Sequence, residues 1–480
     1  MTSITLYGGA NEIGGNKVLL RDGDTQIFLD FGFNFSRREM FFDEFLQPRN
    51  TNGLGDYFEL GLFPKIEGLY REDGLIPTDL DYCEPRFQGI LPSHPHIDHI
   101  GGIPFTDWSI PVYCSETIKR IIELIETTSR GGVQCEYLRG RSRPFGDATR
   151  IHWSKWEVFQ RRFDEIDRFG EFRIEAYELD HSIRGSYGLL LHTNGGTVAY
   201  TGDLRLHGPR GSLTRSFIES LMNEDIEALI IEGTRVEEKK ENVLVEELIG
   251  KRGERLSSIE EVKEKSIAAL SDTDKPVFVD FNSRDFDTLR VFYEVAKESG
   301  RKLVLPFKIA YAVKALPDLV ELEIDDEDLV IYKERKGLGS YDRRDRYQSW
   351  ERDLLDMHNA RRYEWIRSNL SKLVVHLSYY NLQNLVDLKP DGGIYINAST
   401  EPFNEEMALD FKRLDNWRKR FNLEYRYFHA SGHLSKEEVF RFIEDVNPRK
   451  VIPIHTEGSR VFEKKFENVI LPRVGVPIEL

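Results

Sequence analysis

The chain has 480 residues, of which 40% are hydrophobic, so it can bury one large core or two of moderate size. Its 82 acidic residues outnumber 66 Lys and Arg residues, and the net charge of −16 does not favour promiscuous binding to nucleic acid. No window approaches the roughly 18 consecutive apolar residues of a membrane span, and the chain opens on a strand pattern without a secretory leader. We therefore expect a soluble, cytoplasmic protein of two domains that does not act at a membrane.

The first third of the chain is predicted to form short strands at residues 4–8, 17–21 and 26–30, separated by Gly-Gly and Asp-Gly turn signals. This pattern indicates an antiparallel meander. A segment dense in Phe, Tyr, Gly and Pro follows at residues 31–86. Segments of this length usually serve as lids or binding loops, but a packed surface extension fits the composition as well, and both alternatives stay open.

The next predicted elements are a strand at residues 89–92 and a helix at about 116–130. Further strands are expected at residues 172–179, 187–192, 197–201 and 228–232.

From about residue 236 the pattern changes to helix alternating with buried strand, as in the strand 276–281, the helix 285–299 and the strand 302–305. Such alternation is typical of an α/β domain. We expect a first domain that is formed by residues 1–234 and completed by residues 399–480, with a second domain inserted at residues 235–398.

A candidate metal site follows the strand at residues 89–92, where His94, His96, Asp98 and His99 fall within six residues. Neutral imidazoles and a carboxylate are the ligands that zinc prefers, and an irregular turn can bring them to one side. A lone histidine is usually a core or surface residue, but four potential ligands so close together indicate a metal. The three cysteines have no Cys-x-x-Cys spacing, which argues against a thiolate zinc site.

The pattern His-x-His-x-Asp-His followed by Gly-Gly resembles the signature of the metallo-β-lactamase superfamily. Asp30, at the end of a predicted strand, resembles the family's first aspartate, which orients the ligating histidines. His181 in Leu-Asp-His-Ser resembles the isolated third-motif histidine, and Asp203 in Thr-Gly-Asp resembles the carboxylate that bridges two metals. Without the resemblance, Asp203 would be taken for a turn residue.

Three more motifs resemble those of the β-CASP nuclease branch of this superfamily. They are the acidic Glu232 in Ile-Ile-Glu-Gly-Thr, His433 in Ala-Ser-Gly-His and His455 in Ile-Pro-Ile-His. The resemblance spans essentially the whole chain, is nearest in character to ribonuclease J, and implies an α/β fold: a metallo-β-lactamase αββα sandwich with an inserted β-CASP domain. It also implies a zinc-dependent ribonuclease, because in this branch a histidine at the last motif accompanies cleavage of RNA.

The resemblance further implies two zinc ions joined by a bridging water. Their expected ligands are His94, His96, His181 and Asp203 for one ion, and Asp98, His99, Asp203 and His455 for the other. Two such ions about 3.5 to 4 Å apart lower the pKa of the water towards about 7 and stabilise the attacking and leaving oxygens. Catalysis is expected to rest on Asp98, His433 and Glu232, with His433 held by Glu232 as proton donor to the departing 3′ oxygen.

Candidate substrate residues flank this centre. Ser431 and Ser435 resemble the serines that hold a substrate phosphate in ribonuclease J, which predicts digestion from a 5′ monophosphate, with endonucleolytic cuts as well. Ser283 and Arg284 lie where a buried strand meets a helix, a place that collects phosphate, although Asn282 or Ser283 would equally serve as a helix cap.

Two stretches mix arginines with aromatic residues, as single-stranded RNA surfaces do. One holds Arg139, Arg141, Arg143, Arg150, Phe145, Trp153 and Trp156, and the other runs from residue 341 to 362. Each would equally be a solvated face with internal ion pairs. The alternatives left open for the whole chain are an endonuclease of the 3′-end cleavage type, a DNA nuclease, a small-molecule hydrolase and a silent RNA-binding scaffold; RNA is the expected partner, and a homodimer remains an option.

Overall fold

The computed structural model describes residues 1–43, 45–129, 131–141, 143, 158–237, 256–271, 273–337, 339–400 and 405–480. The chain divides into two compact units. The first unit comprises Met1–Leu206, Arg210–Glu238 and His433–Leu480, and the second comprises His207–Pro209 and Lys239–Gly432. Among the described residues, none of the helices combines the length and the apolar character needed to cross a membrane.

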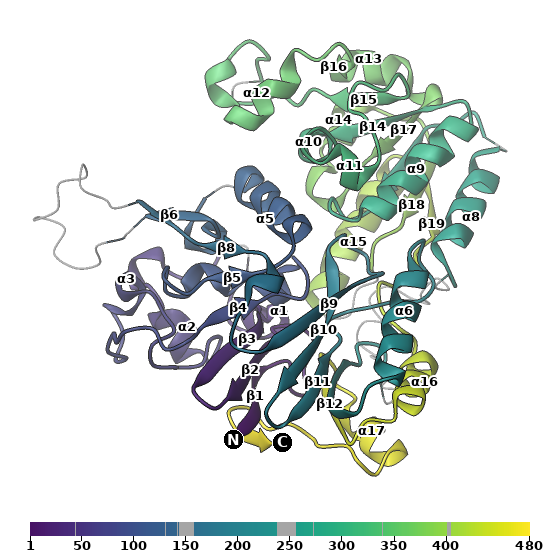
Figure 1. Cartoon of the computed structure of the whole chain (residues 1–480). Coiled ribbons are helices and arrows are strands. Elements are labelled where there is room, and N and C mark those ends of the chain that lie inside the picture. The colour runs from purple at the N-terminus through teal and green to yellow at the C-terminus, as the bar shows by residue number, and fades with distance from the viewer. Residues whose placement is uncertain are drawn as a thin grey trace, which may run out of the picture. The chain divides into compact units, whose positions relative to one another are not determined.

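The first sheet of the first unit has the order β21-β1-β2-β3-β4-β5-β8 (Figure 1). Its strands are β1 (Thr2–Gly8), β2 (Lys17–Asp22), β3 (Thr25–Phe31), β4 (Gly89–Leu91), β5 (Val112–Tyr113), β8 (Phe163–Asp164) and β21 (Pro477–Glu479). The antiparallel meander predicted from the turn signals is present, since β2 pairs antiparallel with both β1 and β3. β4 then adds in parallel beside β3, which brings the metal motif to the end of β3.

The second sheet of the first unit has the order β20-β12-β11-β10-β9. Its strands are β9 (Arg173–Leu179), β10 (Ser186–Thr193), β11 (Gly196–Tyr200), β12 (Ile226–Glu232) and β20 (Lys450–Ile454). β20 pairs in parallel with β12, with Glu232 opposite Ile454. This pairing explains why the C-terminal part of the chain belongs to the first unit.

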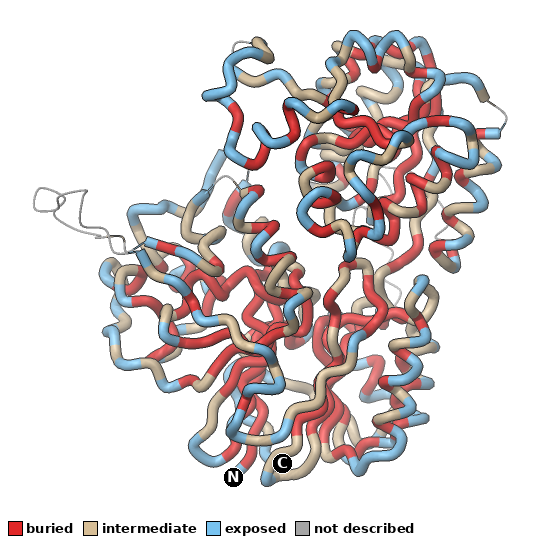
Figure 2. The backbone as a smooth tube through the Cα atoms, turned by 45° about the horizontal axis from the view of Figure 1, so that its top comes forward, coloured by how far each residue is buried: buried red, intermediate tan, exposed pale blue. Residues whose placement is uncertain are grey.

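The core of the first unit lies between these two sheets. Alternate residues of β3, such as Ile27 and Leu29, pack in one cluster with Leu189, Leu191 and other residues of the second sheet. A second cluster on the outer face of the second sheet includes Phe217 of α6 (Gly211–Met222) and Phe442 of α16 (Lys436–Val446). Figure 2 shows long buried stretches of the chain in the part of the molecule that holds the two termini. Sheets packed face to face with helices outside are the arrangement expected from the resemblance.

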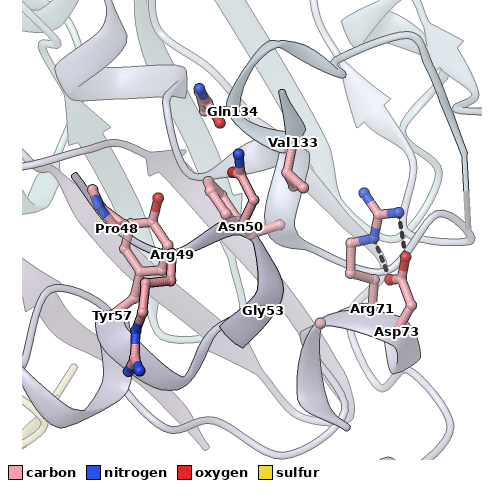
Figure 3. A pocket seen from close by; sticks show the side chains of 11 residues that line it. Pro48, Arg49, Asn50, Gly53, Tyr57, Arg71, Asp73, Val133 and Gln134 are labelled. Carbon is pink, nitrogen blue, oxygen red and sulfur yellow. Dashed lines mark hydrogen bonds and ion pairs between the residues drawn. The ribbon is translucent and has the colours of Figure 1, made fainter. Parts of the chain in front are cut away.

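The segment at residues 31–86 packs as a surface extension. It contains α1 (Phe35–Glu39), α2 (Gly55–Glu59) and α3 (Glu72–Leu75). Its aromatic rings form a buried cluster in which Phe63 lies 6.0 Å from Phe31 and 5.1 Å from Phe105, measured between ring centroids. Arg71 is buried beside Asp73, and both residues line a pocket (Figure 3). Of the two alternatives for this segment, the structure therefore shows the packed extension.

The remaining elements of the first unit flank the sheets. They are α4 (Ile97–Ile100), α5 (Glu116–Thr128), α17 (Ser459–Lys465) and a two-stranded ribbon of β6 (Arg139–Arg141) and β7 (Val158–Gln160). Ser115 caps α5 at the N-terminus by accepting a hydrogen bond from the backbone N–H of Ile118, and the buried face of the helix includes Ile121 and Ile122.

The second unit is built on a parallel sheet with the order β16-β15-β14-β17-β13-β18-β19. Its strands are β13 (Val277–Asp280), β14 (Lys302–Pro306), β15 (Leu329–Tyr332), β16 (Ala360–Arg361), β17 (Leu373–His376), β18 (Gly393–Asn397) and β19 (Leu423–Tyr427). Its helices are α8 (Ile259–Ser271), α9 (Phe286–Glu298), α10 (Phe307–Ala315), α11 (Pro317–Val320), α12 (Ser349–Leu355), α13 (Tyr363–Ser368), α14 (Asn384–Leu388) and α15 (Glu405–Arg420). The inserted α/β fold predicted from helix and strand alternation is confirmed.

The boundaries of this unit differ from the prediction. The sequence placed the return to the first domain at residue 399, but β19 pairs in parallel with β18, so the second unit extends to Gly432. A helical pattern was expected from about residue 236, and residues 238–255 of that stretch lie outside the described part of the chain. The first described helix there is α8, which begins at Ile259.

Candidate metal centre

The candidate ligands lie in segments that follow strands of the first unit, and Asp98 and His99 belong to α4. His94, His96, Asp98 and His99 follow β4, His181 follows β9, Asp203 follows β11 and His455 follows β20. β9, β11, β12 and β20 run in the same direction, because β10 is antiparallel to both β9 and β11 while β12 is parallel to β11 and β20. Their carboxyl ends therefore share one edge of the sheet, and residues distant in sequence meet there.

Ligating atoms gather there in four overlapping groups, within each of which they lie no more than 4.8 Å apart. The groups are His94, His96 and His181; His94, His99 and Asp203; Asp98, His99 and His455; and His181, Asp203 and His433. Like His94, His99 and His181, Asp203 belongs to two of these groups. Its Oδ2 lies 3.2 Å from Nε2 of His99, 3.8 Å from Nε2 of His455 and 3.7 Å from Nε2 of His94. A carboxylate in this central place suits a ligand shared by two ions.

Two buried polar atoms test whether these residues fit a metal. Nε2 of His99 and Oδ1 of Asp203 are buried and have no hydrogen-bond partner among the described residues. Unpartnered buried polar atoms are costly, since each loses its water without compensation. A divalent cation would satisfy both atoms, and imidazole with carboxylate is a zinc-type ligand set. The residues present therefore fit the expected metal.

Protonation states in this cluster follow burial and neighbouring charges. Burial, together with the neighbouring His99, lowers the pKa of His94 well below its ordinary value, which favours the neutral imidazole that binds metals. Burial alone would raise the pKa of Asp203, but the surrounding histidines outweigh it and hold the pKa well below the ordinary value.

Asp30 contacts the segment that carries the candidate ligands after β4. Its Oδ1 accepts a hydrogen bond from the backbone N–H of Ser93 at 2.6 Å, and its Oδ2 lies 2.7 Å from Nδ1 of His99. Tyr200 also donates its hydroxyl to Oδ2. With the Nδ1 proton of His99 directed at Asp30, Nε2 is left to face the centre.

A threonine that the sequence did not single out orients His455. The hydroxyl of Thr234 lies 2.8 Å from Nδ1 of His455, which leaves Nε2 of His455 facing Asp98 at 3.1 Å. The backbone N–H of His455 donates to the carbonyl of Gly9 at 2.9 Å. His455 adopts a φ of 54°, an uncommon conformation for a residue with a side chain, and these contacts hold it there. The only signal in the sequence was the position of Thr234 two residues after Glu232.

A buried ion pair joins two ligand loops and was also missed. Nε of Arg205 lies 2.9 Å from Oδ1 of Asp180, and both side chains are almost completely buried. Asp180 directly precedes His181, and Arg205 follows Asp203 by two residues. The pair therefore ties the loop of His181 to the loop of Asp203.

His433 and Glu232 meet beside the cluster. Nδ1 of His433 lies 3.0 Å from Oε1 of Glu232, whose other oxygen accepts the backbone N–H of Thr234 at 3.0 Å. Burial lowers the pKa of His433, but the Glu232 and Asp203 carboxylates outweigh it, so that the pKa is raised to about 9. The side chain of His433 is 21% exposed, so the group can be protonated and reached from outside.

The predicted substrate residues are divided between the two units. Ser435 belongs to the first unit, where its hydroxyl accepts the N–H of Glu438 and caps α16. Ser431 is buried in the second unit, which also holds Ser283 and Arg284 between β13 and α9. The helix cap there is Asp285, so neither Asn282 nor Ser283 has the capping role that was the alternative.

The first arginine and aromatic stretch is described only in part. Arg143 pairs with Glu136, with 2.6 Å between Nη2 and Oε1, while Arg139 and Arg141 lie on β6. The other predicted members, Phe145, Arg150, Trp153 and Trp156, lie outside the described residues.

Comparisons with known proteins agree with this geometry. Residues 419–472, which include His433 and His455, match the family model of the Zn-dependent metallo-hydrolase RNA specificity domain. "Ribonuclease J" of Mycoplasma genitalium is 20% identical over 466 residues, covering 95% of this chain and 68% of the relative. "Ribonuclease J 2" of Streptococcus pyogenes is 22% identical over 474 residues, covering 95% of this chain and 70% of the relative.

A solved structure shares the fold along its whole length. A protein of unknown function from Enterococcus faecalis V583 matches with a TM-score of 0.69 and 20% identity, and the match covers 100% of both chains. At this identity the likeness shows the fold alone. The sheet sandwich, the inserted α/β unit, the match to the RNA specificity domain and the relatives together support a metallo-β-lactamase protein of the β-CASP, ribonuclease J-like type.

Proposed function

We propose that the chain is a metal-dependent hydrolase that cleaves phosphodiester bonds of RNA. The observation that carries the proposal is the meeting of the imidazole and carboxylate cluster with the His433 and Glu232 pair at one edge of the sheet. The cluster supplies metal ligands, and the pair supplies a proton donor beside them. The relatives named ribonuclease J support RNA as the substrate class.

Two zinc ions are the proposed metals. His94, His96, His181 and Asp203 would hold one, and Asp98, His99, Asp203 and His455 would hold the other. When bound, the ions supply hydroxide at neutral pH and positive charge for the phosphate oxygens. Asp30 and Thr234 would keep Nε2 of His99 and of His455 directed at the metals.

His433 is the proposed general acid. Its Nδ1 faces Glu232, so Nε2 is the nitrogen available to protonate the departing 3′ oxygen. The carboxylate of Glu232 fixes the ring and stabilises its protonated form. His433 also belongs to one group of potential metal ligands, with His181 and Asp203, and the metal content of a His433 variant separates the two roles.

Attack from a monophosphorylated 5′ end is the proposed mode of cleavage, with Ser431 and Ser435 as phosphate contacts and Ser283 and Arg284 as further contacts to RNA. The cap at α16 uses a lone pair of the Ser435 hydroxyl and leaves its proton free to be donated. The competing mode is an endonuclease whose substrate passes the site in both directions.

The test uses 3′-labelled RNAs that differ only in carrying a 5′ hydroxyl, monophosphate or triphosphate, with a circular RNA and a matched DNA strand alongside. Preference for the monophosphate and an intact circle would support the exonuclease. Rapid cutting of the circle without preference among the ends would establish the endonuclease. Cleavage of the DNA alone would overturn the assignment to RNA.

A further inference from the structure

Three arginines and two tyrosines form a continuous surface beside the β16 edge of the second unit's sheet. The Cζ atoms of Arg335 and Arg367 lie 4.8 Å and 5.8 Å from the ring centroid of Tyr363. Arg362 lies 4.6 Å from the ring centroid of Tyr341, measured in the same way. We call these five residues the Arg–Tyr surface. Arg362 directly follows β16, and Tyr363 begins α13.

Two members of this surface, Tyr341 and Arg362, come from the stretch at residues 341–362 that the sequence singled out, and other arginines of that stretch are paired differently. Nη2 of Arg343 lies 2.9 Å from Oδ2 of Asp345, and Nη1 of Arg344 lies 2.8 Å from Oδ2 of Asp356. Both arginines therefore form ion pairs within the stretch. Arg335 of this surface pairs with Asp387. Arg362 and Arg367 are exposed, and within the described part of the chain neither forms an ion pair with a carboxylate. The positive charge of the Arg–Tyr surface that no described carboxylate pairs is therefore that of Arg362 and Arg367.

A guanidinium that lies on an aromatic ring is held in one orientation while its N–H edge stays open to solvent. That edge binds phosphate in a bidentate manner, and its outer face stacks on a nucleobase. Stacking between arginine and tyrosine alone would stabilise the fold by only about 0.5 to 1 kcal/mol at an exposed site and needs no ligand. The lack of a carboxylate partner at Arg362 and Arg367 is what favours an anionic partner over this purely structural role.

We propose that the Arg–Tyr surface binds the backbone of single-stranded RNA, outside the metal centre. The proposal rests on the proposed action on RNA and names a further place where the substrate is held. A net charge of −16 repels a polyanion in general, so RNA must be held by local positive groups such as these. A single strand fits this surface better than a duplex does, because its flexible backbone can bend to contact the arginines of the Arg–Tyr surface. Duplex RNA is instead recognised across successive grooves.

The test measures binding of a fluorescent 30-nucleotide RNA to the full-length, zinc-loaded His433→Ala protein, in which cleavage is suppressed. In this background, Arg362→Gln with Arg367→Gln is expected to weaken binding about tenfold at low salt. The slope of log K against log salt should become shallower by about 1.4, which is about 0.7 for each lost phosphate contact to a single strand. Arg343→Gln with Arg344→Gln is the matched control and should bind as the parent does.

A second variant separates charge from stacking. Arg362→Lys with Arg367→Lys keeps both charges without the planar guanidinium, so it should restore the salt slope and only part of the affinity. Unchanged binding in the glutamine variant, or an equal loss in the control, would overturn the proposal. Cleavage of RNA by the unsubstituted enzyme tests the proposed function separately, since none of these variants enters that measurement.

Discussion

Nδ1 of His433 lies 3.0 Å from Oε1 of Glu232, although 201 residues separate them in the chain. The contact exists because β20 pairs with β12, which returns the chain to the first unit after the whole inserted unit. A buried carboxylate beside an imidazole stabilises the protonated ring and fixes its orientation.

The role of His433 predicts a specific loss. His433→Ala should keep its full metal content and cleave RNA about two to four orders of magnitude more slowly, as expected when a general acid is removed. Glu232→Gln, which keeps the shape of the side chain, should slow cleavage less. Single-turnover cleavage and elemental analysis give the two quantities. Loss of metal from His433→Ala would assign this histidine to the ligand set instead.

Asp203 should behave differently, because it lies at the centre of the cluster. Asp203→Ala is expected to lose both metal binding and activity, since one carboxylate serves both ions. Asp225→Ala is a suitable control because that carboxylate is exposed and pairs with Arg449. If Asp203→Ala retained two zinc ions per chain, its proposed bridging role would be refuted.

Removal of metal should abolish cleavage reversibly. The purified protein is expected to contain about two zinc ions per chain, to lose activity on dialysis against a chelator and to regain it when zinc is returned. Mass spectrometry of the native protein and a cleavage assay on the same samples make the comparison. A fully active preparation without metal would contradict the proposed mechanism.

The hydroxyl of Thr234 should tune zinc affinity through His455. Thr234→Val keeps the shape of the side chain but removes the contact to Nδ1, so zinc affinity should fall about 10- to 100-fold. Thr234→Ser restores a hydroxyl and should recover most of the affinity. Competition with a chromogenic chelator reports the affinity without any assay of activity. Equal zinc affinities for the valine and serine variants would show that the hydroxyl has no such role.

A pH effect is expected in the second unit, away from the metal centre. Burial raises the pKa of Asp280 from 3.8 to about 7, and a hydrogen bond from Tyr395 opposes this only in part. The folded state therefore holds the proton more tightly than the unfolded state, and stability should fall as the pH rises from about 4 to about 7. Asp280→Asn should remove this part of the pH dependence.

Hydrogen exchange in β13 and β18, the strands that contain Asp280 and Tyr395, measures the effect locally. The amides of the parent should exchange faster at pH 8 than at pH 5 after correction for the intrinsic rate, and those of the Asn variant should show a smaller difference. Identical pH profiles for the two proteins would show that Asp280 titrates in its ordinary range.

The sequence by itself determined the chemistry of the cluster between His94 and His99, because four ligands within six residues need only one irregular turn to converge. It also indicated the meander and the inserted α/β unit, because turn residues and the period of apolar residues are local properties. Asp203 and His455 could be assigned only through the resemblance, since each alone resembles an ordinary turn residue.

Only the tertiary structure decided the features that depend on pairing between distant segments. The contacts of Thr234 with His455 and of Asp180 with Arg205 form where loops from different strands meet, and no local pattern encodes them. The end of the inserted unit moved from residue 398 to Gly432 because β19 takes its place through backbone hydrogen bonds to β18, which any extended segment can make. Likewise, the packing of residues 31–86 was decided by aromatic rings that find their partners only in the folded chain.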